Sequence, residues 1–435
     1  MNKPYKVVSA QEAVQVIKSG DHVHIGCVAA APQTVINAMC DRGRNREFED
    51  VYIHHLHTEG PAPYADPEFE GIFRHDAMFV GKNVRKAVQE GRADYIPVFL
   101  GEIPNLYRKR YVPCDVVLIM VSEPDEDGNV SLGTSVAAIL GAMDVARCVI
   151  AEINPQMPRC FGDAIVPMER IDMFVEADYP LLPAHMAPLD DVSMKIGKNC
   201  AELIEDGACL QMGIGTIPNA ILAQLGNHKN LGVHTEMFSD GVLPLVEKGV
   251  INGSNKALDK GKMVSTFLMG SNKLYDFVNN NKDVAMMECS YTNDPFVVAR
   301  QPKMTAINSC IEIDITGQVC ASSIGSKMFS GVGGQIDFMY GASRAEDGKA
   351  IMAMPSVTNK HTSKIVPYLQ QGAGVETTRY HIHHFATEYG VVDLYGKSLQ
   401  QRAKLLISVA HPDFREDLEK AAVERWGTPF LHVKV

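Results

Sequence analysis

Several signals that would assign the chain to a membrane, secreted or nucleic-acid-binding class are missing from its 435 residues. No apolar run approaches the roughly 20 residues that a membrane helix needs. The N-terminal stretch Met1-Asn2-Lys3-Pro4-Tyr5 lacks the apolar core of a signal peptide. A formal net charge of −11 argues against binding to a phosphate backbone. We therefore expect neither a membrane nor a nucleic acid as partner.

Paired cysteines are also missing, since none of the ten cysteines belongs to a Cys-x-x-Cys pair. Several lie beside apolar residues, as in Cys148-Val149-Ile150 and Ala208-Cys209-Leu210. Such thiols behave as small hydrophobic core residues. Without a secretion signal, this pattern predicts reduced thiols and a cytoplasmic protein.

Three common catalytic or nucleotide-binding motifs are absent as well. There is no Gly-x-Ser-x-Gly nucleophile elbow, which argues against a serine hydrolase of that type. The glycine-rich segment at 213–220 lacks the Gly-Lys-Ser/Thr of a P-loop and the third glycine of the dinucleotide fingerprint. A nicotinamide dehydrogenase is therefore weakly supported.

Short apolar runs alternate with amphipathic stretches along the whole chain. This alternation predicts an α/β fold with mainly parallel sheets, in which ligands bind at the carboxyl ends of the strands. The predicted strands are His22–Ile25, Val51–His55, Val116–Val121, Val149–Glu152, Ala208–Met212, Met263–Met269, Met304–Asn308 and Ala350–Met354. The predicted helices are Ala10–Ser19, Gln33–Arg42, Val84–Glu90, Asp190–Asp206, Ile217–Leu225, Leu274–Asn279 and Leu399–Ala410.

Two segments resemble each other and suggest a duplication. Residues 14–26 and 201–213 both read as helix, turn, strand and glycine. At one fixed offset, Gly20 matches Gly207 and Gly26 matches Gly213, and the tripeptide His-Thr-Glu occurs at both 57–59 and 234–236. We predict two similar domains, 1–187 and 188–435; a single domain with two similar βα units is the alternative.

Two glycine clusters are candidate anion sites. Gly213-Ile214-Gly215-Thr216-Ile217 follows a predicted strand and opens a helix, whose N-terminus favours anions. Ser330-Gly331-Val332-Gly333-Gly334 has three glycines in four residues, a composition suited to an anion nest or oxyanion hole. A turn that requires glycine is the alternative for the first cluster, and a β-bulge or tight turn is the alternative for the second.

Two further groups of polar residues could carry chemistry. Glu59 and Glu236 end the two His-Thr-Glu tripeptides, and either carboxylate could act as base, metal ligand or nucleophile. The residues alone do not separate them, and most single glutamates are solvated surface groups. His381 and His383 would share one face of a possible strand beside His384, but nothing else in the sequence completes a metal site, so we predict none.

Taken in order, several motifs of this chain resemble those of the acetyl-CoA hydrolase/transferase family of CoA-transferases. The resemblance spans nearly the whole chain and is nearest to the 4-hydroxybutyrate and butyrate:acetate CoA-transferase branch. The motifs are Glu152-Ile153-Asn154, Met157-Pro158, 213–220, 234–241, 331–338, Met354-Pro355-Ser356-Val357, 363–367, Thr387-Glu388-Tyr389-Gly390, 399–403 and Ala410-His411-Pro412.

The resemblance implies two α/β domains with the active site in the cleft between them, and it implies a glutamate nucleophile at Glu236 rather than at Glu59. It also implies that Gly334 offers an oxyanion-hole N–H and that Asn293 is an active-site amide. The CoA-binding residues that it implies are Gly213, Ile214, Gly215, Thr216, Ile217, Gly331, Gly333, Asn359 and Lys360. Val28 would lie on the substrate side.

The activity implied is transfer of CoA between short-chain acids such as 4-hydroxybutyrate, butyrate and acetate. The nucleophile would carry CoA as a glutamyl thioester in a ping-pong reaction. Coenzyme A and acyl-CoA would be substrates, with no tightly bound cofactor, and the protein would form a homodimer or homotetramer. The alternatives are an acyl-CoA hydrolase that uses the same glutamate, and a non-catalytic binder of acyl-CoA or of a sugar-phosphate type of ligand on a related α/β fold.

Overall fold

The computed structural model describes residues 5–184 and 188–435, which form two compact units. The first unit consists of Met1–His185 and Lys262–Thr292, and the second of Met186–Gly261 and Asn293–Val435. The predicted domain boundary at 187 lies outside the described residues. The segment Lys262–Thr292, which the prediction included in the second domain, packs with the first unit instead. Each unit is described by itself below.

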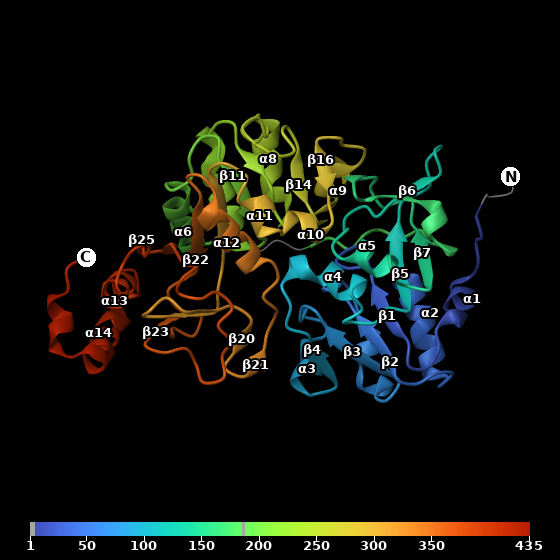
Figure 1. The fold of residues 1–435 in the computed structure, drawn as a ribbon, viewed down its shortest axis with the longest axis horizontal. Coiled ribbons are helices and arrows are strands. Elements are labelled where there is room, and N and C mark those ends of the chain that lie inside the picture. The colour runs from blue at the N-terminus through green and yellow to red at the C-terminus, as the bar shows by residue number, and fades with distance from the viewer. Residues whose placement is uncertain (1–4, 185–187) are drawn as a thin grey trace. The chain divides into compact units, whose positions relative to one another are not determined.

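A parallel sheet of seven strands forms the centre of the first unit, in the order β10-β7-β5-β1-β2-β3-β4 (Figure 1). Every residue of β5 and β7 is buried, as expected for the middle of a parallel sheet that is covered on both faces. The strands are β1 His22–Ile25, β2 Val51–His54, β3 Phe73–Ala77, β4 Ala93–Tyr95, β5 Val116–Val121, β7 Cys148–Ile153 and β10 Met173–Glu176.

Shorter elements complete the first unit. Its helices are α1 Ala10–Ala13, α2 Gln33–Arg44, α3 Arg85–Gln89, α4 Ile103–Arg108, α5 Ile139–Met143, α9 Asn272–Val278 and α10 Cys289–Thr292. Its remaining strands are β6 Asn129–Ser131, β8 Phe161–Gly162, β9 Ile165–Pro167, β14 Met263–Ser265, β15 Phe267–Leu268 and β16 Val284–Met286.

A sheet of six strands, β12-β11-β17-β22-β24-β25, forms the centre of the second unit. Its first five strands are parallel, and β25 pairs antiparallel with β24. The strands are β11 Cys209–Met212, β12 Gly232–Val233, β17 Met304–Asn308, β22 Lys349–Ala353, β24 His384–Thr387 and β25 Gly390–Asp393. Smaller strands are β13 Met237–Phe238, β18 Glu312–Asp314, β19 Val319–Cys320, β20 Ser323–Ile324, β21 Lys327–Met328 and β23 Ile365–Val366.

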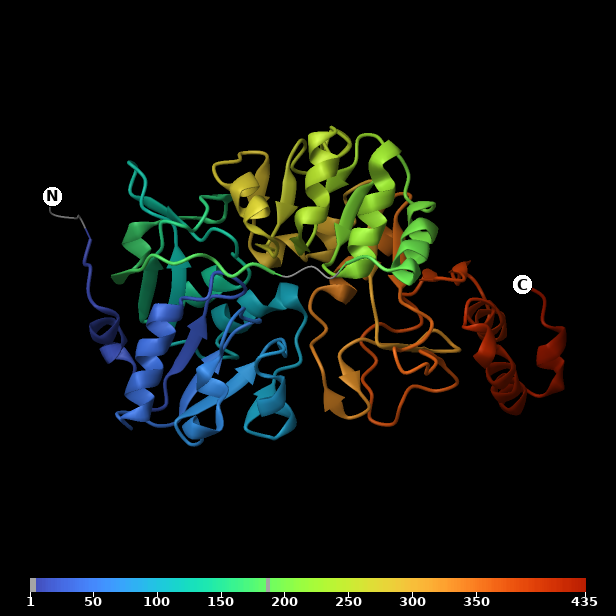
Figure 2. The same cartoon turned by 180° about the vertical axis from the view of Figure 1, so that it is seen from behind.

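Helices of the second unit begin at recognisable capping residues. Asp190 and Ser193 form a capping box at the start of α6, and Ser398 and Gln401 form another at the start of α13. The last two helices of the chain, α13 and α14, pack against each other (Figure 2). The helices are α6 Asp191–Ala201, α7 Thr216–Gln224, α8 Leu243–Glu247, α11 Pro295–Val298, α12 Gln335–Arg344, α13 Leu399–Ser408 and α14 Pro412–Trp426.

The two main sheets share one strand order. In the first unit β2-β1-β5-β7-β10 are neighbours in that order, and in the second unit β12-β11-β17-β22-β24 follow the same order with the same parallel pairing. β1 and β11 are each followed directly by a glycine, Gly26 or Gly213, and β2 and β12 each lead into a His-Thr-Glu tripeptide. The predicted pair of similar, mainly parallel α/β units is confirmed.

Each predicted strand and helix corresponds to an element of the described fold, with boundary differences of a few residues. One predicted strand, Met263–Met269, is divided into β14 and β15. The predicted helix Ala10–Ser19 is shorter, because α1 passes into a 3₁₀ turn at Val14–Val16. The prediction that His381 and His383 lie on a strand is wrong, since β24 begins only at His384.

Four buried histidines lie in the sheet of the first unit: His24 on β1, His54 on β2, His55 directly after it, and His75 on β3. One ring nitrogen of each is hydrogen-bonded, for example His24 Nδ1 to the Tyr107 hydroxyl at 2.8 Å. The other nitrogen of each is buried and has no partner among the described residues. Burial therefore lowers the pKa of His24 and His54 to about 3 and that of His75 to about 4, and lowers the pKa of His55 strongly.

These histidines should make the first unit sensitive to acid. A histidine with a lowered pKa stabilises the fold fully above its unfolded pKa of about 6.5, and this contribution is lost as the pH falls. Each one changes the free energy of unfolding by about 1.4 kcal/mol per pH unit below that value. We expect unfolding near pH 5, measured by circular dichroism in a pH series with urea.

A variant pair tests the origin of this slope. His75→Leu should reduce the pH dependence of the unfolding free energy by about a quarter of the four-histidine total. His432→Gln, at an exposed position, should leave it unchanged. An unfolding free energy that stays constant between pH 5 and pH 7 in the unmodified protein would contradict the expectation.

Candidate active site

The carboxyl edge of the parallel sheet in the second unit collects most of the predicted site residues. β11 ends at Met212 and leads into the glycine loop at 213–215, while β12 ends at Val233 and leads to Glu236. α12, which begins at Gln335 and precedes β22, is a crossover helix of the same sheet. Because crossover helices run back across a parallel sheet, their N-termini lie at the carboxyl edge of the strands. Two glycine-preceded helix N-termini, those of α7 and α12, therefore share this edge with Glu236.

Glu236 is partly buried and lies between β12 and β13. Its Oε2 accepts a hydrogen bond of 3.0 Å from Nδ2 of Asn293, a fully buried residue just after α10. The same Nδ2 lies 3.5 Å from Oδ2 of Asp337 in the first turn of α12. Since both neighbours of this nitrogen are carboxylate oxygens, the amide must direct its NH₂ group toward them. The structure thus places Glu236 against an oriented amide donor.

Gly334 is the N-cap of α12 and makes room for this arrangement. A Cβ atom at this position would collide with both Nδ2 of Asn293 and Oε2 of Glu236. Only glycine therefore allows both side chains to approach the helix start. Gly333 before it has a φ of 56°, in the left-handed region, so two successive residues of opposite backbone hand precede the helix. This conformation directs backbone N–H groups into a common concavity, which suits a negatively charged atom.

The structural reason for glycine differs between positions 213 and 215. Gly215 has a φ of 114° and caps α7, which explains glycine at this position by backbone conformation alone. Gly213 does not have a positive φ, and a Cβ there would meet no atom within 4 Å. Its counterpart Gly26 is enclosed, because a Cβ would lie 3.1 Å from the carbonyl oxygen of Ala30. Neither backbone strain nor packing thus requires glycine at 213, which leaves approach of a ligand as a physical reason for it.

The loop after Glu236 is docked onto the helix that follows Gly215. A Cβ at Gly241 would come within 2.8 Å of Asn219 Oδ1 and of Leu222 Cδ1, so the turn lies close on α7. The neighbours of Glu236 in the chain, Thr235 and Met237, line a small and mainly apolar pocket together with Gly213. Packing of these neighbours fixes the backbone from which the Glu236 side chain projects.

The second His-Thr-Glu glutamate has other neighbours. Glu59 Oε1 lies 3.6 Å from Nε2 of His57, and the Glu59 side chain is partly exposed. The backbone N–H of Glu59 donates to the carbonyl of Val28, and the N–H of Val28 donates to the carbonyl of His57. Val28 is buried and has a φ of 50°, a strained conformation for a β-branched residue. The two glutamates therefore differ in their contacts, since Glu236 accepts a hydrogen bond from a buried amide and Glu59 lies beside a histidine. The backbone of Val28, next to Glu59, is strained.

Asn359 and Lys360 are exposed in a loop that follows β22 and is closed by the bridge between Val357 and Ser363. Within the described residues, neither side chain makes a hydrogen bond or an ion pair. The structure therefore brings Glu236, Asn293 and Gly334 together, with the 213–217 loop at the same sheet edge. It leaves Asn359 and Lys360 on the surface, and Val28 belongs to the first unit.

Asp337 and Gly241 were not among the predicted site residues, although both belong to the motifs at 331–338 and 234–241. Their signal was the turn-forming Ser-Asp-Gly after Glu236 and the acidic residue three positions after Gly334. The ten cysteines are free and buried, which confirms their prediction as core residues. Burial raises the pKa of the Cys27 thiol to about 11, so this group is a poor nucleophile at neutral pH.

Comparison with known proteins identifies the family. The acetyl-CoA hydrolase/transferase N-terminal domain matches residues 2–183, and the corresponding C-terminal domain matches residues 270–422. The chain therefore belongs to the acetyl-CoA hydrolase/transferase family.

Individual relatives match over almost the full chain. The succinyl-CoA:acetate/propanoyl-CoA:succinate CoA transferase of Fasciola hepatica is 48% identical over 96% of this chain and 87% of that protein. The 4-hydroxybutyrate coenzyme A transferase of Clostridium kluyveri is 47% identical over 95% and 96%. The crystal structure of 4-hydroxybutyrate CoA-transferase from Porphyromonas gingivalis is 38% identical with a TM-score of 0.83, over 97% of this chain and 98% of that one.

These relatives confirm the predicted family, the fold class and the CoA-transferase class of enzyme. The roles of single residues remain predictions. No helix in the described part of the chain is long and apolar enough to cross a membrane.

Gly334→Ala should disturb the candidate site without unfolding the protein. The added methyl group would collide with the ends of two side chains, which can move, rather than with backbone. We expect the bond between Asn293 and Glu236 to break and the Glu236 carboxylate to be displaced, as seen in a crystal structure of the variant. Gly213→Ala is the matched control, because its methyl group has open space. An unchanged position of the Glu236 carboxylate in Gly334→Ala would contradict this expectation.

Proposed function

We propose that the enzyme transfers CoA between short-chain carboxylic acids, with Glu236 as the nucleophile that carries the CoA. The observation that supports this proposal is the position of the Glu236 carboxylate, against the Asn293 amide and Gly334 at the start of α12. A carboxylate is a weak nucleophile in water, but a thioester is an activated target. The nearby N–H groups of the glycine turn suit the oxyanion that forms when a carboxylate adds to a thioester.

In the first half-reaction, an oxygen of Glu236 attacks the thioester carbonyl of acyl-CoA. The C–S bond breaks, which yields a mixed anhydride of Glu236 with the acyl group and frees CoA as its thiolate. The thiolate then attacks the Glu236 carbonyl of the anhydride. The acid leaves as a carboxylate, and Glu236 remains as a glutamyl-CoA thioester.

The second half-reaction reverses these steps with another acid. Its carboxylate attacks the glutamyl thioester, the thiolate leaves and attacks the acyl carbonyl of the new anhydride, and Glu236 is regenerated. Each step passes through a tetrahedral oxyanion that the N–H of Gly334 and the amide of Asn293 stabilise. Loss of one such donor typically raises the barrier by about 2.7–4 kcal/mol.

Binding of CoA is assigned to the two glycine segments. Residues Gly213–Ile217 lie at the N-terminus of α7, where backbone N–H groups and the helix dipole favour a phosphate. Gly331 and Gly333 flank the thioester, and the exposed Asn359 and Lys360 contact CoA from the loop after β22. Val28 acts on the acyl side, where its strained backbone is consistent with a functional position.

The acids exchanged are small, and 4-hydroxybutyrate or butyrate with acetyl-CoA are the substrates that we propose. The relatives support this choice, but they also extend it, because the protein of 48% identity is named for succinyl-CoA, acetate and propanoyl-CoA. A substrate panel should therefore include succinate. A homodimer or homotetramer and the lack of a tightly bound cofactor remain parts of the proposal.

Glu236→Gln should abolish transfer while leaving the protein folded, because the amide has the same size but is not a nucleophile. We expect the transfer rate to fall by roughly 10³-fold or more, as for other covalent nucleophiles. Borohydride added after acyl-CoA should reduce a glutamyl thioester, and peptide mass spectrometry should locate the reduced residue at 236.

Glu247→Gln is the control, since Glu247 is an exposed glutamate at the end of α8 in the same unit. It should keep full activity and full labelling at Glu236. Labelling at another residue, or a Glu236→Gln variant with normal transfer, would overturn the proposed nucleophile.

Hydrolysis by the same glutamate is the second candidate function, because the family description covers hydrolases as well as transferases. The two functions differ in what attacks the glutamyl-CoA thioester: a second carboxylate in transfer, which keeps CoA in a new thioester, or water in hydrolysis, which frees it. For a transferase we expect no sustained release of free CoA, followed with a thiol reagent, with or without added carboxylate, while the acyl-CoA of the added acid forms only when that acid is present. Steady release of CoA without added carboxylate would identify a hydrolase.

A further inference from the structure

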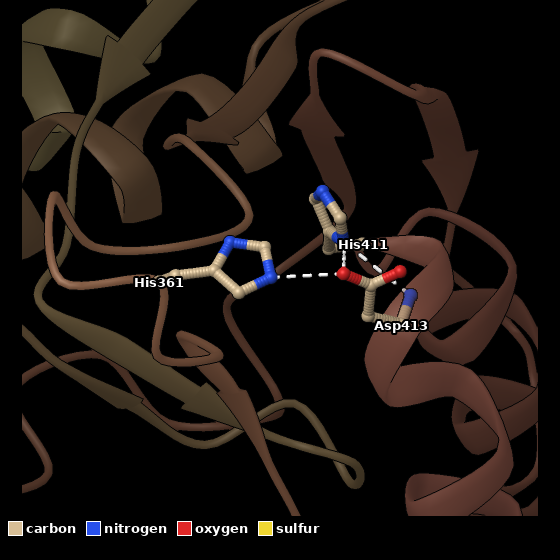
Figure 3. Close-up of side chains that lie close together, drawn as sticks. All are labelled: His361, His411 and Asp413. Carbon is tan, nitrogen blue, oxygen red and sulfur yellow. Dashed lines mark hydrogen bonds and ion pairs between the residues drawn. The ribbon is translucent and has the colours of Figure 1, made fainter.

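A second cluster of reactive side chains lies outside the candidate active site. It consists of His361, in the loop between Val357 and Ser363, and of His411 and Asp413 at the start of α14 (Figure 3). Among the described residues this is the one group of three histidine, cysteine, aspartate or glutamate side chains whose ligand atoms all lie within 4.8 Å of one another. We propose that these three residues form a binding site for a divalent transition metal ion, with Zn²⁺ as the reference ion.

The distances between the candidate ligand atoms are close to those between the ligands of a bound metal ion. Oδ2 of Asp413 lies 2.9 Å from Nε2 of His361 and 3.6 Å from Nδ1 of His411. Ligands of a tetrahedral zinc ion, at bond lengths of about 2.0–2.2 Å, are separated from each other by about 3.3–3.5 Å. Two of the three separations therefore need to change by only a few tenths of an ångström. Two imidazoles and one carboxylate are also a ligand set that zinc accepts, with the fourth position left to water.

The hydrogen bonds support binding through Nδ1 of His411. This atom accepts the backbone N–H of Asp413 at 3.3 Å, since His411 is the N-cap of α14. An acceptor nitrogen carries no proton, which is the state that a metal ligand needs. Because this nitrogen has a single lone pair, the bond to the metal replaces its hydrogen bond with the Asp413 N–H. Two electron-rich atoms, Nδ1 of His411 and Oδ2 of Asp413, thus face each other, and a cation between them would relieve their repulsion. The hydrogen atom between His361 Nε2 and Asp413 Oδ2 lies where the metal would bind. On metal binding this proton passes to solvent and Nδ1 of His361 takes up another, so that the imidazole stays neutral and Nε2 is free to coordinate.

The helix N-terminus opposes a cation, because it carries a partial positive charge of roughly +0.5. The carboxylate of Asp413 contributes a full negative charge in direct contact with the metal, which outweighs this effect. The ring of His411 is also held between aromatic neighbours, with Phe414 at 6.1 Å and Tyr389 at 5.5 Å between ring centroids. His361 and Asp413 remain mostly exposed, so an ion reaches the site directly from solvent. A bound metal would fasten the loop that contains His361 to the first turn of α14.

Titration of the full-length protein with Zn²⁺ after removal of metal with a chelator tests this site. Isothermal titration calorimetry should detect about one equivalent, and the thermal unfolding midpoint should rise with Zn²⁺ concentration. The ten cysteines are buried, so thiols of the folded protein do not compete for the ion. The visible spectrum of a Co²⁺ complex should show tetrahedral coordination without a thiolate band.

Variants connect the binding to these residues. His361→Ala and Asp413→Asn should each weaken binding by about tenfold or more, since loss of an outer-shell partner alone costs that much. His411→Asn removes the imidazole but keeps a residue that caps helices well, so α14 should remain folded. His432→Ala, at another exposed histidine of the same unit, should bind like the unmodified protein. Absence of saturable binding, or equal binding by His361→Ala, would overturn the proposal.

Discussion

The absence of a side chain at residue 334 is the constraint on which the candidate active site depends. Glu236, Asn293 and Asp337 come from three separate parts of the second unit and meet at the first turn of α12. Any Cβ at Gly334 would occupy the space where the Glu236 carboxylate meets the Asn293 amide. One hydrogen atom in place of a methyl group thus allows a carboxylate, an amide donor and a helix N-terminus to converge.

The two units show how one topology can serve different purposes. Both place a glycine directly after the first strand and a His-Thr-Glu tripeptide after the second. In the first unit, Gly26 is enclosed by neighbouring backbone and Glu59 lies beside His57. In the second unit, Gly213 faces open space and Glu236 lies beside an amide. The shared sequence pattern therefore indicates the shared fold, whereas the surroundings of the glutamate differ: Glu59 contacts a histidine two positions before it, and Glu236 contacts Asn293, 57 positions along the chain.

The contrast between a shared local pattern and different contacts in space explains which features could be predicted from the sequence. Local patterns were sufficient for the strands at His22–Ile25, Val116–Val121 and Met304–Asn308, because a short apolar run in a parallel sheet is recognisable by itself. Local patterns were also sufficient to predict that the backbone of the two glycine clusters adopts an unusual conformation. They could not choose between Glu59 and Glu236 without the family motif, since the discriminating contact comes from Asn293, 57 positions along the chain. The packing of 262–292 with the first unit likewise leaves no local signal.

The burial of all ten cysteines has a consequence for an enzyme that handles coenzyme A. On the proposed pathway, the free thiolate of CoA forms in every catalytic cycle beside the protein. In the presence of a disulfide or another two-electron oxidant, an accessible cysteine in that neighbourhood would form a mixed disulfide with CoA, which would consume the substrate and block the enzyme. A folded surface without thiols leaves CoA as the one accessible thiol, and in this sense the hydrophobic core protects the substrate as well as the protein.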